Sequence, residues 1–268
     1  MNGLERIADA LHRSRAQGLR AALMPYLMGG FPDIDSSLEI GRACARAGAT
    51  LLELGVPFSD PLADGPVIHA AATEALKQGA NLAQVLELTE ALAPELPVVV
   101  MCYANPILAR GLGRFADQLQ ETGASGVIVP DLPFEEAGAV LRACDERGLA
   151  LVPLVAPTTT DERLELIGRR ARGFVYVVSV TGTTGERAAV DGTVASLVER
   201  VAAHTDVPVA VGFGIATPDQ ARAVAEAGAD GVIIGSRLVR AAGEADDPPA
   251  AVGELVEQFR EALRTTNA

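Results

Sequence analysis

The chain has 268 residues, of which 49% are hydrophobic and 27 are glycine, and it contains no tryptophan. Its length matches the roughly 250 residues of a one-domain (β/α)8 barrel, although two small domains would also fit, and its composition excludes a disordered chain. The net charge of −13 argues against nucleic acid or an anionic membrane as a partner, while a small phosphate ester could still bind where helix N-termini and backbone N–H groups attract it locally.

The first predicted element is an extra N-terminal helix over residues 4–11. Leu4, Ile7 and Leu11 fall at helical spacing, and Glu5 and Asp9 lie on other faces. A basic amphipathic transit peptide is the alternative interpretation, which the two acidic residues disfavour.

The cysteines and the lengths of the apolar runs indicate in which cellular compartment the protein works. Cys44, Cys102 and Cys144 lie in apolar surroundings and lack the spacing of a metal site, which indicates buried thiols in a reducing environment. No apolar run approaches the roughly 18 residues that span a bilayer. We therefore expect a soluble, cytoplasmic protein.

Eight short apolar runs are predicted strands, and helical patterns separate them. They are apolar on both faces, as expected for a parallel sheet covered on both sides. Several follow a helix that ends at a glycine, the residue suited to a left-handed helix terminus, and Gly123, Gly148 and Gly173 are 25 residues apart. The predicted strands are residues 22–28, 50–54, 97–102, 126–130, 149–155, 174–178, 207–211 and 231–234. Their strict alternation with helices favours a single (β/α)8 TIM barrel domain over residues 1–268, with a doubly wound open sheet as the alternative.

The second predicted strand contains an acid, Glu53, within the apolar run 50–55. If its side chain faces inward, partial desolvation should raise its pKa toward the range where a carboxyl group both gives and takes protons near neutral pH. A salt-bridged or rim-exposed glutamate is the alternative.

The loop after this strand, residues 57–66, contains Asp60 and Asp64 among turn-forming residues. Either aspartate could simply bond to its own backbone. In a barrel, however, this loop overhangs the C-terminal mouth, which makes Asp64 a candidate partner of Glu53.

Glycine also follows each of the last three predicted strands. The three junctions are residues 178–185, residues 211–214, and Ile234-Gly235-Ser236, the last of which leads into a short predicted helix. Barrels build phosphate sites at this position, because glycine lets backbone amides and a helix N-terminus approach an anion. The alternative is that these glycines only turn the chain.

The remaining polar and aromatic candidates are weaker. His12, His69 and His204 are far apart in the predicted fold, so they support neither a metal site nor a catalytic triad, and metal-free acid–base chemistry is expected. Tyr103 and Tyr176 lie at the end of and within predicted strands, where packing is the default interpretation.

Residues 52–66, Leu-Glu-Leu-Gly-Val-Pro-Phe-Ser-Asp-Pro-Leu-Ala-Asp-Gly-Pro, closely resemble the signature of the tryptophan synthase alpha chain family. The resemblance continues in order over nearly the whole chain, through the motifs at residues 24–30, 101–106, 130–133, 184–185, 212–215 and 235–236. It implies cleavage of indole-3-glycerol phosphate to indole and glyceraldehyde 3-phosphate, a retro-aldol reaction that uses no cofactor in this subunit.

The same resemblance implies roles for individual residues. Glu53 would be the acid and base, Asp64 would hold the indole N–H, and Asp60 would signal to a partner, the beta chain, which carries pyridoxal phosphate and forms an α2β2 assembly. Residues 181–190 would form a lid, from which Thr184 reaches toward Asp64. The implied phosphate and pocket residues are Gly185, Gly214, Gly235, Ser236, Tyr176, Phe213 and Tyr26.

Two residues depart from the family pattern. Tyr26 stands where the family usually has Phe, and Thr183 stands where it has an aliphatic residue, which affects packing and the lid more than the chemistry.

Two other functions remain as alternatives. Another phosphate-binding barrel, such as a sugar-phosphate isomerase or epimerase, would share the glycine loops. A regulatory subunit without catalysis is the rival from another class, and the presence of both Glu53 and Asp64 argues against it.

Overall fold

The computed structural model describes residues 1–178, 192–212 and 214–265. In this part of the chain, nine strand segments form one parallel sheet in the order β5-β4-β3-β2-β1-β9-β8-β7-β6. The segments are β1 (Ala22–Met28), β2 (Leu52–Gly55), β3 (Val98–Met101), β4 (Gly126–Ile128), β5 (Ala150–Leu151), β6 (Leu154–Val155), β7 (Val175–Val178), β8 (Val209–Gly212) and β9 (Gly231–Ile234).

The predicted fifth strand, residues 149–155, closes the sheet into a barrel. Its two halves are β5 and β6, and between them Pro153 has no N–H to donate. The Val152 N–H donates to the Val127 carbonyl at 3.0 Å, and the Tyr176 N–H donates to the Pro153 carbonyl at 2.9 Å. The run therefore joins β4 to β7. The predicted eight-stranded barrel is confirmed, and the open-sheet alternative is wrong.

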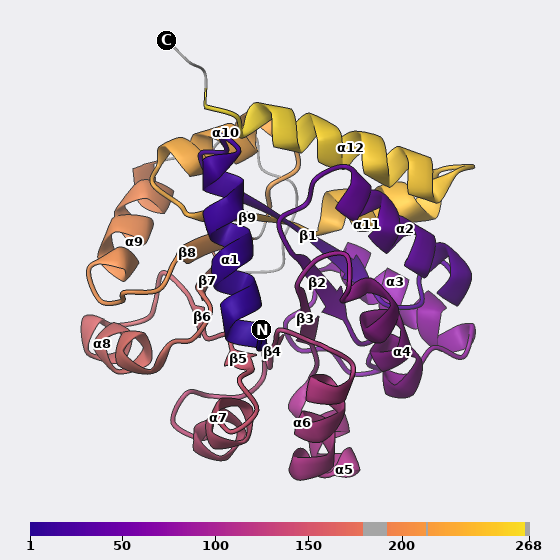
Figure 1. The fold of residues 1–268 in the computed structure, drawn as a ribbon, viewed down its shortest axis with the longest axis horizontal. Coiled ribbons are helices and arrows are strands. Elements are labelled where there is room, and N and C mark those ends of the chain that lie inside the picture. The colour runs from indigo at the N-terminus through magenta and orange to yellow at the C-terminus, as the bar shows by residue number, and fades with distance from the viewer. Residues whose placement is uncertain (179–191, 213, 266–268) are drawn as a thin grey trace.

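Helices surround the barrel in the described residues (Figure 1). The predicted strict alternation of strands and helices was wrong after β2, β3 and β9, because two helices follow each of these strands instead of one. The helices are α1 (Gly3–Ala16), α2 (Ile34–Arg46), α3 (Pro66–Lys77), α4 (Leu82–Leu92), α5 (Ala104–Arg110), α6 (Leu112–Glu121), α7 (Gly138–Asp145), α8 (Asp161–Arg170), α9 (Gly192–Ala202), α10 (Pro218–Glu226), α11 (Ser236–Glu244) and α12 (Pro248–Ala262). None of these helices is long and apolar enough to cross a membrane.

Local sequence explains where several helices begin and end. Thr217 and Gln220 form the expected capping box at the start of α10, with Pro218 at the first helical position. The chain leaves α10 through Gly228, whose φ of +96° is accessible mainly to glycine.

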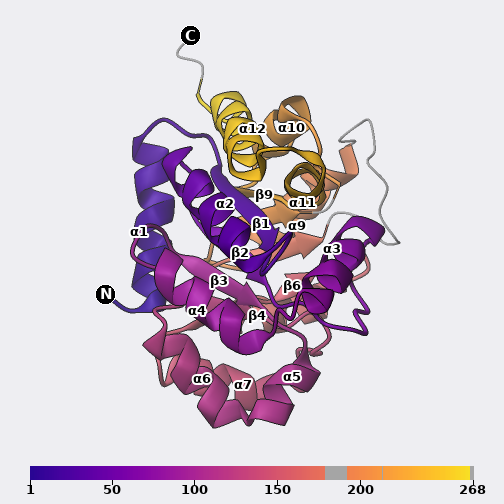
Figure 2. The same cartoon turned by 90° about the vertical axis from the view of Figure 1, so that its right-hand side faces the viewer.

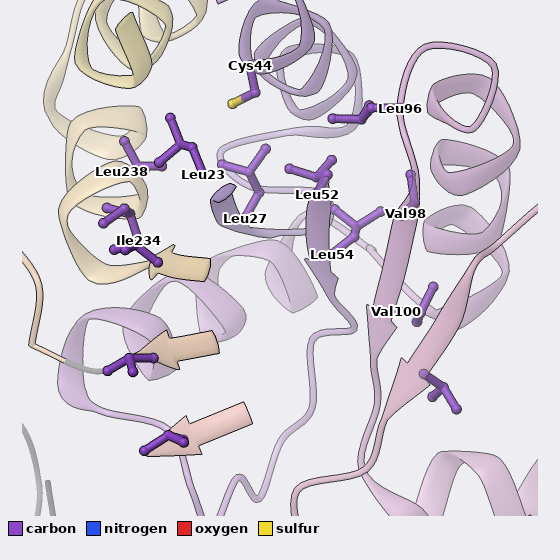
Figure 3. Packing of buried hydrophobic residues seen from close by; sticks show 14 of the residues in the cluster. Leu23, Leu27, Cys44, Leu52, Leu54, Leu96, Val98, Val100, Ile234 and Leu238 are labelled. Carbon is purple, nitrogen blue, oxygen red and sulfur yellow. The ribbon is translucent and has the colours of Figure 1, made fainter. Parts of the chain in front are cut away.

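The core has two layers, because side chains alternate along each strand. One layer lies between strands and helices; Figure 3 shows Leu23, Leu27, Leu52 and Leu54 of β1 and β2 near Cys44 of α2. The other layer fills the barrel interior, with members Met24, Tyr26, Val99, Ile128, Val152, Tyr176, Ala210 and Ile233. Since Leu52 and Leu54 face the helices, the residue between them faces the barrel interior.

Helix α1 covers the N-terminal end of the barrel. The Leu4 N–H donates to the Gly148 carbonyl at 3.1 Å, and the Arg6 guanidinium donates to the carbonyls of Gly123 at 2.7 Å and Leu96 at 3.1 Å. These three carbonyls lie just before β3, β4 and β5, at the N-terminal ends of the strands. Figure 2 shows α1 and α3 on opposite sides of the barrel, so α1 does not cover the side on which α3 follows the second strand.

Candidate active site

Glu53 is the central residue of the site. It lies on β2, paired in register with Tyr26 of β1 and Val99 of β3, and only 2% of its surface is exposed. Neither carboxyl oxygen has a hydrogen-bond partner among the described residues. Burial, with a smaller contribution from the charge of Asp64, raises the pKa of Glu53 from 4.5 to about 8. At neutral pH this carboxyl can therefore be protonated and still release its proton.

A cavity of about 570 Å³ opens beside Glu53 at the C-terminal mouth of the barrel. Such a volume suits a small organic ligand. Seven of the site residues expected from the sequence line this cavity: Tyr26, Glu53, Asp64, Tyr176, Gly214, Gly235 and Ser236.

Asp64 is held in place by Tyr103. The Tyr103 hydroxyl donates to Asp64 Oδ1 at 2.9 Å and accepts from the Ala63 N–H at 3.1 Å, while its ring stacks on Phe58 with centroids 5.3 Å apart. Partial burial raises the pKa of Asp64, and both the Tyr103 hydrogen bond and the charge of His69 oppose this rise. The two acids of the cavity thus differ: Asp64 has a donor, and Glu53 has none among the described residues.

Two tyrosines occupy space that glycines leave open. A Cβ added to Gly55 would lie 2.2 Å from the Tyr26 hydroxyl, and one added to Gly212 would lie 2.3 Å from the Tyr176 hydroxyl. Both phenols are almost fully buried, at 6% and 4% exposure, and burial raises the pKa of each well above its ordinary value. They therefore stay neutral and form two walls around Glu53.

The loops after β8 and β9 form the other end of the cavity. Gly214 has a φ of +80°, and a Cβ there would meet no atom of the described residues within 4 Å, so this backbone borders the cavity without crowding it. Gly235 precedes α11, which begins at Ser236, so the short helix predicted after this glycine is present. The first N–H groups of a helix have no acceptor within it, so this end of the cavity suits an anion.

Four predicted residues are not placed in the cavity. Asp60 is exposed in the loop outside the cavity wall, where its carboxylate accepts from the Ser59 hydroxyl at 2.5 Å. Thr184, Gly185 and Phe213 lie outside the described residues, as does the predicted lid at residues 181–190.

Sequence reasoning missed three residues. Tyr103 was assigned to packing, yet its hydroxyl bonds the candidate acid Asp64; its place directly after a strand was the available signal. Arg237 and Arg240 line the cavity on the first turns of α11, and their positions just after Gly235-Ser236 could have indicated this.

The arrangement supports acid–base chemistry on a molecule that carries an anionic group at one end. A buried carboxyl group with a pKa of about 8 and a hydrogen-bonded aspartate lie in the cavity wall, and glycine loops with a helix N-terminus line the same cavity. Among the described residues, no three His, Cys, Asp or Glu side chains are grouped closely enough to hold a metal ion.

Comparison with known proteins points to one family. The family model of the tryptophan synthase alpha chain matches residues 12–267. The chain is 46% identical over 259 residues to the tryptophan synthase alpha chain of Synechococcus elongatus, covering 96% of each chain. It is 51% identical over 223 residues to that of Synechococcus sp. CC9902, covering 82% of this chain and 83% of the relative. A structure of Mycobacterium tuberculosis tryptophan synthase superposes with a TM-score of 0.91 at 38% identity, covering 97% of this chain and 99% of the other.

Proposed function

The chain belongs to the tryptophan synthase alpha chain family, and we propose that Glu53 and Asp64 carry out the reaction of that family in the cavity at the barrel mouth. The chain is a lyase of L-tryptophan biosynthesis that cleaves indole-3-glycerol phosphate to indole and glyceraldehyde 3-phosphate. One observation carries the assignment of residues: a buried carboxyl, Glu53, faces the cavity without a partner among the described residues and with its pKa raised to about 8.

Glu53 acts as both acid and base. Its protonated carboxyl gives a proton to the indole carbon that bears the glycerol chain, which places positive charge on the ring. The resulting carboxylate accepts the proton of the neighbouring hydroxyl group; the carbon–carbon bond breaks, its electron pair returns to the ring, and the aldehyde forms. A pKa near the working pH suits both steps, because neither protonation state is strongly favoured.

Asp64 stabilises the charge that develops on the ring. Its carboxylate accepts the indole N–H, which becomes more acidic as the ring is protonated. Tyr103 positions this carboxylate by donating to Oδ1 at 2.9 Å, and the second oxygen is left for the substrate.

The phosphate group binds at the opposite end of the cavity. Gly214, Gly235 and Ser236 offer backbone N–H groups and a hydroxyl there, at the place where barrels bind phosphate. Further residues proposed for the phosphate, the pocket wall and the contact with Asp64 are Gly185, Phe213, Thr184, Tyr26 and Tyr176.

The partner of this chain is a tryptophan synthase beta chain in an α2β2 assembly, which receives the indole. We expect no cofactor in this single-domain chain, pyridoxal phosphate in the beta chain, and a cytoplasmic location without contact to membrane or nucleic acid. Exposed apolar side chains near the mouth support a docking surface there: Leu62 is 85% and Leu108 67% exposed, and Asp60 lies in the same loop as Leu62.

The test measures release of indole from indole-3-glycerol phosphate by the chain alone and by the chain with a beta chain. Glyceraldehyde 3-phosphate is measured in parallel. We expect both products in equal amounts and faster release with the partner. Glu53→Gln should abolish turnover and leave substrate binding measurable, whereas Glu87→Gln, which removes an exposed carboxyl on α4, should change neither. Full activity of Glu53→Gln would overturn the assignment. If neither the chain alone nor the chain with a beta chain releases the products, a sugar-phosphate isomerase or a regulatory subunit would be favoured instead.

A further inference from the structure

Arg237 lines the cavity at its phosphate end but has no role in the proposal above. It is the second residue of α11, is partly buried, and shares the cavity wall with Gly214, Gly235 and Ser236. Its guanidinium makes no hydrogen bond or ion pair with the described residues. Elsewhere in the described chain comparable arginines are paired, as in the contact of Arg147 with Asp117 at 2.8 Å.

The Arg237 side chain borders the cavity without a counter-ion among the described residues. Its positive charge is therefore available to an anion that enters the cavity. The cavity also holds the unpartnered carboxyl of Glu53, which independently marks it as a ligand site.

The charges around the cavity favour a cation beside an anionic ligand. Asp64 lies in the same cavity, and the whole chain carries a net charge of −13. Both repel a phosphate dianion, whereas Glu53, with its pKa raised to about 8, is mostly neutral at pH 7. Backbone N–H groups contribute partial charges only, whereas guanidinium carries a full charge and a fork of donors that matches phosphate oxygens.

We propose that Arg237 binds the phosphate group of the substrate, beside the backbone donors at the start of α11. This inference rests on the proposed function. The N–H groups of Leu238 and Val239 already donate to the Gly235 carbonyl, at 2.9 and 3.0 Å. The earlier N–H groups of Ser236 and Arg237 therefore remain for the anion, and the Arg237 side chain extends from the same turn.

The contact should affect affinity for the phosphorylated reactant only. The phosphate group does not react, so a contact to it is equally strong in the ground state and the transition state, and its loss raises KM while kcat stays the same. A charge-assisted hydrogen bond to a partly exposed group corresponds to about a tenfold change in KM.

The experiment uses the reverse reaction, because it separates the two ends of the substrate. The chain is supplied with indole and glyceraldehyde 3-phosphate, and KM is measured for each in the wild type, Arg237→Gln, Arg237→Lys and Arg46→Gln. Arg46 is an exposed arginine at the end of α2, so its variant removes the same charge away from the cavity. Competition by inorganic phosphate is measured in the same assay, and circular dichroism checks that each variant is folded.

We expect Arg237→Gln to raise KM for glyceraldehyde 3-phosphate about tenfold, to weaken competition by inorganic phosphate similarly, and to leave KM for indole and kcat unchanged. Arg237→Lys should recover part of the loss, and Arg46→Gln should behave as wild type. If the folded Arg237→Gln variant keeps the wild-type KM for glyceraldehyde 3-phosphate, or loses indole affinity equally, the inference is overturned. A wild-type chain without activity in either direction would instead refute the proposed function.

Discussion

The unpartnered carboxyl of Glu53 should make the folded protein less stable as pH rises, and Glu53→Gln should remove this dependence. In the unfolded chain the group titrates near its ordinary pKa of 4.5, and in the folded chain near 8. Below 4.5 the group is protonated in both states and has no effect. Between the two values the unfolded state releases the proton and the folded state keeps it, so stability falls by about 1.36 kcal/mol per pH unit; above 8 the loss is complete.

The magnitude follows from the same two values. The carboxyl costs the folded state about 2 kcal/mol at pH 6 and between about 4 and 5 kcal/mol at pH 8.5. Glutamine also leaves a buried polar group without a partner, but that cost does not depend on pH. The stability of Glu53→Gln relative to wild type should therefore increase by between about 2 and 3 kcal/mol from pH 6 to pH 8.5.

Chemical denaturation followed by far-ultraviolet circular dichroism measures this difference, which suits a chain without tryptophan. Comparing variant with wild type at each pH cancels the titration of all other groups. Glu87→Gln, which removes an exposed carboxyl, serves as the control and should show the same small effect at both pH values. A stability difference between Glu53→Gln and wild type that is constant over this range would refute the raised pKa, and with it the acid–base role built on it.

Further changes test the walls of the cavity. Tyr103→Phe removes the donor to Asp64 and the acceptor for the Ala63 N–H, so kcat should fall about tenfold in the indole assay with the fold retained; unchanged kcat would contradict the positioning role. Gly235→Leu adds a side chain at the phosphate end and should raise KM for indole-3-glycerol phosphate at least tenfold, and an unaltered KM would exclude a phosphate site there. Gly55→Ala brings a methyl group 2.2 Å from the Tyr26 hydroxyl and should destabilise the chain by about 1–3 kcal/mol in urea denaturation; adding Tyr26→Phe should recover part of this loss, and strict additivity of the two changes would show that the contact is not the cause.

Features that depend on local sequence were predictable. Parallel strands covered on both faces require continuous apolar runs, so all eight were found within a few residues, and a positive φ at Gly123, Gly148 and Gly173 explains why these glycines mark the ends of helices. Glu53 was found for the same reason, because a single acid in such a run has a side chain that must face either the helices or the barrel interior.

Features that depend on distant residues could not be predicted. Nothing near residue 153 shows that the fifth strand pairs with different neighbours on its two halves, since that depends on how the barrel closes. The contact between Tyr103 and Asp64 joins two loops that follow different strands. The fit of Tyr26 over Gly55 likewise arises only when β1 and β2 lie side by side in register.

The barrel gives two carboxyl groups different chemistry by the way it surrounds them. On β2, the alternation that sends Leu52 and Leu54 toward the helices sends Glu53 into a layer of apolar and phenolic side chains, where no described group compensates its charge and its pKa rises to about 8. Asp64 follows the same strand but lies on a loop, where the Tyr103 hydroxyl opposes the rise in its pKa. One acid is thereby suited to exchange a proton and the other to remain an anion facing positive charge. This separation requires Glu53 to lie in a strand and Asp64 in a loop, so exchanging the two residue types would preserve the composition of the cavity and lose its chemistry.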